Sequence, residues 1–444
     1  MTWRHTFIAW IVAILVSALA WSLWGGVSEV ERTSISRRVH DVAIPVDDVD
    51  RIVVRRSAGL GDEENVDLVF ERTDRGWRQV EPFEVTADGF QIRRLILAAA
   101  DLEATRRSPL KDLAEAGGLE RIGLGADPDG VTLEWPEGAT RIELGARTVA
   151  GRAWVRIAGA DEVMVVDDDL HDRAIDDDPR NWRSRRIFPA ENEITAIEIM
   201  NGEATTRLER DGRLWAMTSP IETRADPMAV DRLIGIYGRV DHDGFVSDRV
   251  DDLADYGFDP PAATLELVRD DDARERVLIG GPSGIVGRGR FAMIDGVPTV
   301  FRLDEATLAG MIPAIGSLIE PTGTGVSPAD VKSVVIDSGA GSLRLERDLD
   351  RWTAGVDGGP AEPIDTESVQ GLLDLLSQTR STDLQVQAFP SSLEVATVVL
   401  HGFDGRPLDA IRIAREPDQG RWALENGDGV LRLFPSGTKI PLLP

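Results

Sequence analysis

The sequence has no cysteine, which excludes disulfide bonds, thiolate metal sites and cysteine nucleophiles in one step. It has only five histidines, and no two of them stand at the spacing of zinc ligands. Positive charge is also scarce, because 49 lysines and arginines stand against 77 aspartates and glutamates, a net charge of -28. So acidic a chain cannot neutralise a run of phosphates, and we expect no nucleic-acid partner.

What the sequence does contain is ordinary globular material. Hydrophobic residues make up 42% of the chain and charged residues 28%, which is not the composition of a disordered protein. The length of 444 residues exceeds what one core usually supports. It indicates about two to four domains.

One long apolar run, Phe7 to Trp24, stands near the N-terminus. Its 18 residues are just enough for a membrane-spanning helix, and tryptophans at both ends suit the membrane interface. We interpret residues 1–26 as a transmembrane anchor and residues 27–44 as a linker. The alternative is a signal peptide cleaved near Ala18-Leu19-Ala20, but the apolar run continues past that site. Either interpretation places the rest of the chain outside the cytoplasm, with membrane lipid as the anchor's partner.

The strongest pattern is an internal repeat anchored by three tryptophans, which are 138 and 137 residues apart. Each tryptophan follows an apolar-Glu-Arg tripeptide after four intervening residues. The three sets are Glu71, Arg72 and Trp77; Glu209, Arg210 and Trp215; and Glu346, Arg347 and Trp352. We expect the tryptophans to be hydrophobic anchors between strand and helix, rather than platforms for a sugar or a peptide. Adjacent strand residues face opposite ways, so we expect each Glu and Arg to have cross-strand partners.

The flanks of each tryptophan predict the same local structure three times. Alternating aliphatic residues upstream indicate half-buried strands. Downstream, Asp88, Asp226 and Asp365 stand where a helix N-cap is expected. An apolar stripe at i, i+3, i+4 and i+7 follows each of them, beginning at Ile92, Val230 and Val369. Such a stripe packs a helix onto one face of a sheet.

The sequence therefore predicts an α+β protein with three tandem modules, each an antiparallel sheet with a packed helix, after an N-terminal transmembrane helix. We place the modules at residues 45–189, 190–325 and 326–444. The first two share an Asp-Leu-Ala turn at Asp112 and Asp252, and the third lacks it. We accordingly expect the third copy to be a truncated, capping module.

Several clusters could be drawn as chemical sites, but each has a simpler interpretation. The acidic runs at 167–169 and 176–178, near His171, are best read as a solvated loop rather than a cation site. His242, between two aspartates, is expected to end a helix, with Gly244 as its stop. The glycines of 280–289 lack the Lys-Ser/Thr end of a phosphate-binding loop. We expect no catalytic, cofactor or metal site, and no enzyme.

Taken together, the N-terminal span, the repeated Glu-Arg and tryptophan frame, the Asp-capped helix and the stretch Asp252 to Pro261 resemble a bacterial family known as domain of unknown function 4340. The resemblance covers nearly all of the chain after residue 45. It implies a membrane-anchored auxiliary component beside ABC-type transport systems of the gliding-motility kind. The implied location is the bacterial inner membrane, with one span and the bulk of the chain in the periplasm. The implied partner is an ABC permease or another envelope protein.

Three hypotheses about function follow. Repeats without a recurring catalytic group favour a scaffold or adaptor. A glycan- or peptide-binding protein would instead expose aromatic residues in one cleft. A carboxylate-based hydrolase would need two acidic residues with separated pKa values facing one cleft.

Overall fold

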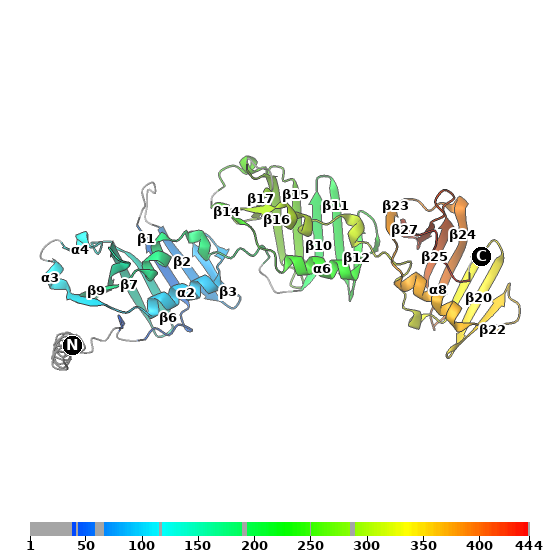
Figure 1. The fold of residues 1–444 in the computed structure, drawn as a ribbon, viewed down its shortest axis with the longest axis horizontal. Helices are drawn as coiled ribbons and strands as arrows, with labels where there is room; N and C mark the ends of the chain where they lie inside the picture. The colour runs from blue at the N-terminus through cyan, green and yellow to red at the C-terminus, as the bar shows by residue number, and fades with distance from the viewer. Residues whose placement is uncertain are drawn as a thin grey trace, which may run out of the picture. The chain divides into compact units, whose positions relative to one another are not determined.

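The computed structural model describes residues 38–40, 43–57, 66–114, 118–188, 193–248, 250–284 and 289–442. The described chain forms three nine-stranded antiparallel sheets, so the prediction of three repeated modules is confirmed (Figure 1). The modules group into two compact units, residues 1–184 and 185–444. The first module is a unit by itself, and the second and third modules share the other unit.

The predicted transmembrane anchor at 1–26 and nearly all of the linker at 27–44 lie outside the described residues. In the described ranges, no helix combines the length and the apolar character that a membrane crossing requires.

The first sheet has the strand order β4-β3-β2-β1-β6-β7-β8-β9-β5. Its strands are β1 Arg51–Arg56, β2 Val66–Thr73, β3 Gly76–Glu81, β4 Val85–Thr86, β5 Arg106–Pro109, β6 Asp129–Trp135, β7 Gly138–Thr148, β8 Arg152–Ile157 and β9 Glu162–Asp167. The chain builds outward from β1 to β4 and then runs through helix α2, Gly89–Ala100, to the opposite edge at β5. It returns to the centre at β6, which pairs with β1, and fills the second half of the sheet.

The second and third sheets repeat this order strand by strand. The second consists of β10 Ile194–Asn201, β11 Ala204–Asp211, β12 Leu214–Ser219, β13 Thr223–Arg224, β14 Gly244–Ser247, β15 Ala263–Arg269, β16 Arg274–Pro282, β17 Gly289–Ile294 and β18 Val300–Asp304. The third consists of β19 Ser333–Ser338, β20 Gly341–Asp348, β21 Arg351–Val356, β22 Glu362–Ile364, β23 Asp383–Val386, β24 Glu394–His401, β25 Pro407–Arg415, β26 Trp422–Glu425 and β27 Val430–Phe434. The expected truncation of the third copy therefore does not extend to its sheet. Its edge strands β22 and β23 are too short to show the alternation by which strands are read from sequence.

Helices α2, α6 (Pro227–Tyr237) and α8 (Thr366–Gln378) each lie across one face of a sheet (Figure 1). The carboxylates of Asp88, Asp226 and Asp365 accept hydrogen bonds from backbone N–H groups in the first turns of these helices, as the sequence predicted. The expected end of the second helix at Gly244 is wrong. Helix α6 ends at Tyr237 because Gly238 caps it, and the residues around His242 follow as an extended segment.

Shorter helical segments connect the strands. They are α3 Leu110–Ala114, α4 Gly118–Arg121, α5 Asp169–His171, the π-turn η1 Asp172–Asp176, η2 Pro179–Trp182, η3 Leu253–Tyr256, α7 Glu305–Met311, η4 Ile315–Leu318, η5 Pro328–Asp330 and η6 Ser391–Leu393. In the third module η6 takes the place before β24 that η3 takes before β15.

The core of each module lies between the helix and the sheet face beneath it. The predicted stripes lie there, and these members are buried: Ile92, Leu95, Ile96 and Ala99; Val230, Leu233 and Tyr237; and Val369, Leu372, Leu373 and Leu376. Ile234, the remaining member of the second stripe, is partly buried. Trp215 and Trp352 are only 6% and 3% exposed, whereas Trp77 is partly buried at the rim of its core. All three tryptophans pack against their cores, as expected of hydrophobic anchors.

Candidate functional site

The repeated glutamates and arginines do not meet in one cluster, because each serves its own module. Glu71 pairs across strands with Arg51 at 3.4 Å, and Glu346 lies 3.9 Å from the Nζ atom of Lys332. The cross-strand expectation is wrong for Glu209, which pairs with Arg207 two residues back on its own strand, at 2.6 Å. The repeated glutamates therefore stabilise their own sheets and do not form a shared site.

The three repeated arginines donate to backbone carbonyl groups, and Arg210 also has the expected cross-strand partner in Glu193. Arg72 bonds to the oxygen of Asp47 at 2.5 Å. Arg210 and Arg347 bond to Gly212 and Leu349, two residues ahead, at 3.0 and 3.1 Å. In the second and third modules the arginine thus closes the turn that leads to the tryptophan.

The predicted loop near His171 is helical only between the two acidic runs, over Asp169–Asp176, whereas Asp177 and Asp178 are irregular. Three carboxylates of this stretch surround one guanidinium group. Arg147 lies 2.6 Å from Asp172, 2.7 Å from Asp176 and 3.8 Å from Asp168. The carboxylates that a cation would need are therefore neutralised by an arginine. Across the described ranges, no group of three or more His, Asp or Glu side chains is arranged to hold a metal ion.

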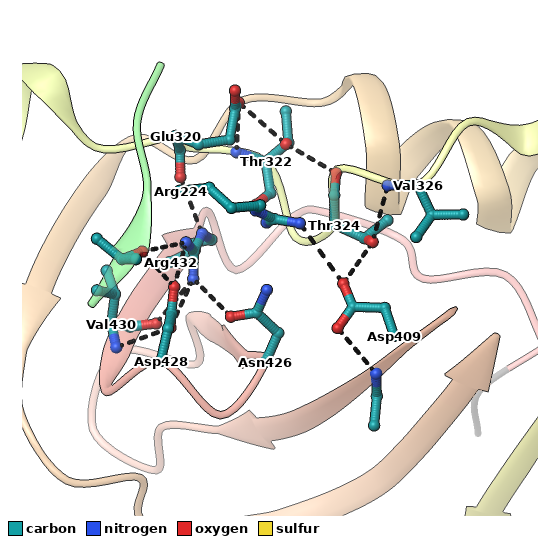
Figure 2. Close-up of polar contacts among 12 residues, drawn as sticks. Arg224, Glu320, Thr322, Thr324, Val326, Asp409, Asn426, Asp428, Val430 and Arg432 are labelled. Carbon is teal, nitrogen blue, oxygen red and sulfur yellow. Dashed lines mark hydrogen bonds and ion pairs between the residues drawn. The ribbon is translucent and has the colours of Figure 1, made fainter. Parts of the chain in front are cut away.

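The most heavily built polar site lies where the second and third modules meet, and its centre is Arg432 (Figure 2). Arg432 is fully buried in β27. The strand registers put it in the position that Met164 has in the first sheet and Phe301 in the second. Its Nη2 atom lies 2.7 Å from the carboxylate of Asp428, and its Nε atom donates to the carbonyl oxygen of Glu320 at 2.9 Å.

Asp428 carries these contacts across to the second module. Its carboxylate accepts a 2.5 Å hydrogen bond from the hydroxyl of Thr223, at the edge strand β13. Burial alone would raise the pKa of Asp428, but the hydrogen bond and charge of Arg432, together with hydrogen bonds from Thr223 and the Val430 backbone, outweigh burial and lower that pKa. The ionised form of the carboxylate is therefore favoured, with Arg432 as the largest stabilising contribution.

A second arm of the junction runs through Arg224 and Asp409 (Figure 2). Arg224 donates to the carbonyl oxygen of Thr322 at 3.2 Å and lies 3.5 Å from Asp409, which also accepts from Thr324 at 2.5 Å. Burial lowers the pKa of Arg224, and the nearby charge of Arg432 lowers it further. The two arginines repel each other, so the carboxylates around them are needed to hold the site together.

Asp226 contributes a third connection, because it serves two modules at once. It caps helix α6 and also pairs with Arg380 of the third module at 2.5 Å, while only 3% exposed. The sequence predicted Asp226 only as a helix cap and did not predict the rest of the junction. A partial signal was present, since Arg432 interrupts an otherwise apolar strand, Val430–Phe434.

A groove of about 520 Å³ lies on the sheet face of the second module that the helix leaves open. Its charged lining is already paired: Glu266 with Arg276 at 2.5 Å, and Asp295 with the same arginine at 3.6 Å. Burial would raise the pKa of Glu266, but its arginine partners outweigh burial and lower that pKa. A general acid needs the opposite shift, so this groove offers the hydrolase hypothesis no support.

The imidazole of His242 has a lowered pKa, and its surroundings explain the shift. It is 5% exposed, stacks on Phe301 at 4.6 Å between ring centroids, and meets Phe245 edge-on at 4.3 Å. Burial lowers its pKa to about 4, with a further contribution from the charge of Arg185. The folded protein therefore binds this proton less readily than the unfolded chain.

This shift makes stability depend on pH between about 6.5 and 4. The stabilising contribution is complete above the unfolded pKa and is lost as the pH falls toward the folded pKa. With these two values we expect about 2 kcal/mol of destabilisation between pH 7 and pH 5 from His242 alone. Phenylalanine keeps the stacking but cannot titrate. Between pH 7 and pH 5, the free energy of unfolding of His242→Phe, measured in urea, should therefore fall by about 2 kcal/mol less than that of the wild type. An equal loss in both proteins would contradict the assignment to His242.

A family model described as "Domain of unknown function (DUF4340)" matches residues 77–214 and 215–398, and the two matches begin at Trp77 and Trp215. No curated protein matches the chain. Among solved structures, the crystal structure of the DNA polymerase sliding clamp from Pseudomonas aeruginosa with ligand aligns with 88% of this chain and 92% of its own, at 9% identity. The TM-score is 0.15, so that alignment supports no argument about fold or function.

Proposed function

The chain belongs to the DUF4340 family, and we propose that it is a non-enzymatic scaffold or adaptor on the periplasmic side of a bacterial inner membrane. In this proposal the N-terminal segment anchors the chain in the membrane. The modules then hold a protein partner, an ABC permease or another envelope protein, at a set distance from the bilayer.

The observation that carries the proposal is the buried junction around Arg432. A side chain of β13, a backbone carbonyl of the segment after β18 and side chains of the third module hold two modules in one unit there. A protein that only displayed independent binding modules would not need such a junction between them. A scaffold does need it, because it must keep a fixed spacing between the ends that it connects.

The open-face groove of the second module favours a second candidate, a periplasmic peptide- or glycan-binding protein. Met200, 44% exposed, and Leu278 line this groove between the paired charges. A groove with an apolar floor and fixed polar groups is typical of a binding site. The repeat itself, however, is better explained by a scaffold.

The test is an affinity pull-down of the full-length protein, solubilised in detergent from its native membrane, with mass spectrometry of the bound proteins. The control carries residues 1–44 alone. We expect an ABC permease and its ATPase at near-stoichiometric yield. Recovery of nothing above the control would contradict a stable complex and favour the peptide- or glycan-binding candidate.

A further inference from the structure

In the first two modules a short segment of the chain, here named the closing segment, adds one more strand to the sheet edge. In the first module Asp88 N–H donates to Trp182 at 2.7 Å, and Ser184 N–H donates to Thr86 at 2.9 Å. Arg183 stands opposite Ala87 in antiparallel pairing. The side chains of Trp182 and Arg183 are 2% and 3% exposed, so the segment also covers part of the core.

The second module repeats this arrangement with a different sequence. Asp226 N–H donates to Leu318 at 2.8 Å, and Glu320 N–H donates to Arg224 at 2.9 Å. Ile319 stands opposite Ala225. Leu318 and Ile319 are 1% and 2% exposed. The edge position is thus a receptor for a short antiparallel strand that carries two adjacent large side chains.

The third module has the same receptor without an occupant among the described residues. Strand β22 pairs with β21 on its inner side, and Ile364 stands opposite Trp352, where Ala87 and Ala225 stand opposite their tryptophans. The groups that correspond to the two outer hydrogen bonds are the carbonyl of Pro363 and the N–H of Asp365. The described chain offers neither of them a backbone partner.

Side-chain burial also differs between the third module and the first two at this edge. Leu343, Ala354 and Ile364 are only partly buried in the third module. The side chains at the same register positions of the first two modules are all buried: Leu68, Gln79 and Ala87, and Thr206, Met217 and Ala225. An apolar shelf is therefore left open beside β22, and Val356, 59% exposed, extends it.

We propose that the edge of β22 receives an extended segment of a partner protein by antiparallel strand addition, with two adjacent large side chains, at least one of them apolar, filling the shelf. Backbone hydrogen bonds supply affinity in such recognition, and the side-chain positions supply specificity. Exposed carboxylates at Glu362 and Glu367 flank the site and favour basic residues beside that pair. This inference deepens the proposed scaffold function by naming how the partner docks.

Because the chain contains no cysteine, a single cysteine can be introduced as a disulfide probe of the proposed edge. Two single-cysteine variants of the full-length protein, Ile364→Cys and Val149→Cys, are incubated in a glutathione buffer with a synthetic peptide of residues 314–323 that carries Ile319→Cys. The pair at 225 and 319 has the close spacing of a non-hydrogen-bonded antiparallel pair, which suits a disulfide. We expect at least tenfold more mixed disulfide at position 364 than at Val149, which is 97% exposed. Equal yields would overturn the proposal.

A second pair of variants tests the hydrogen bond itself, each added to Ile364→Cys. Asp365 has φ of -61°, which proline also adopts, so Asp365→Pro removes the N–H without straining the backbone. Asp365→Ala removes the helix cap but keeps the N–H. We expect about fivefold less mixed disulfide with the proline variant than with the alanine variant. Equal yields with proline and alanine would contradict strand addition.

Sedimentation of the full-length protein distinguishes a second copy of the chain from a separate partner. We expect no oligomer that depends on this edge. A dimer that Ile364→Asp dissociates would show that the edge is filled by a second copy, and it would overturn the assignment to a partner. The peptide result is independent of the membrane pull-down, so failure of the docking proposal and failure of the scaffold proposal can be told apart.

Discussion

Arg432→Met is expected to destabilise the third module by about 3–5 kcal/mol and to make the second and third modules unfold in separate steps. The corresponding position of the first sheet is occupied by Met164, so a methionine side chain fits at this place in the fold. The loss comes from Asp428, which is left nearly buried without its cation, and from the carbonyl of Glu320, which loses a donor. Removing one partner of a buried ion pair costs far more than the pair itself contributes.

Urea unfolding followed by tryptophan fluorescence measures this effect, and hydrogen exchange resolves which module opens. The matched control is Arg302→Met, because Arg302 is an exposed arginine on β18 of the second module. It should change the free energy of unfolding by no more than about 0.5 kcal/mol. Adding Asp428→Asn to Arg432→Met should recover part of the loss, since the carboxylate that lost its cation is then replaced by a neutral amide. If Arg432→Met unfolded like the wild type, the junction would not be what joins the two modules.

Trp215→Ala is expected to cost about 3–5 kcal/mol of stability in the second module, because it removes a large side chain from a closed core. Trp352→Ala should cost as much in the third module. Trp77→Ala should cost clearly less, since Trp77 has the same place in the repeat but is only partly buried. Thermal unfolding monitored by circular dichroism ranks the three variants. Equal losses of stability at all three positions would mean that the burial of the tryptophan does not determine its contribution to stability.

Local features were predictable from the sequence because their causes are local. Asp88, Asp226 and Asp365 cap helices through hydrogen bonds that span two or three residues, and such bonds leave a direct mark on residue choice. Alternation with a period of two marked strands such as β10 and β19. The end of α6 was misplaced for a similarly local reason, since two glycines, Gly238 and Gly244, both offered a stop.

The candidate site was not predictable in the same way. Arg224 and Asp409 are 185 residues apart in the chain, and Thr223 and Asp428 are 205 residues apart. In a chain with 77 acidic residues, nothing local marks the two that an arginine will need. The closing segments were also hidden, because Trp182-Arg183 and Leu318-Ile319 share a place in the fold but not a sequence.

The sequence by itself determined that this chain is a threefold repeat of Asp-capped helices on alternating strands, because helix caps and side-chain periodicity act over a few residues. Only the tertiary structure decided which strands are neighbours, with β6 returning to β1 at the centre of the sheet. It also decided that Arg432 is a buried joint rather than a surface charge, and that the edge of β22 is left uncovered. Each of these features depends on side chains and backbone groups that are far apart in the sequence and meet only in the folded chain. The strength of such contacts depends on burial, which the local sequence does not show.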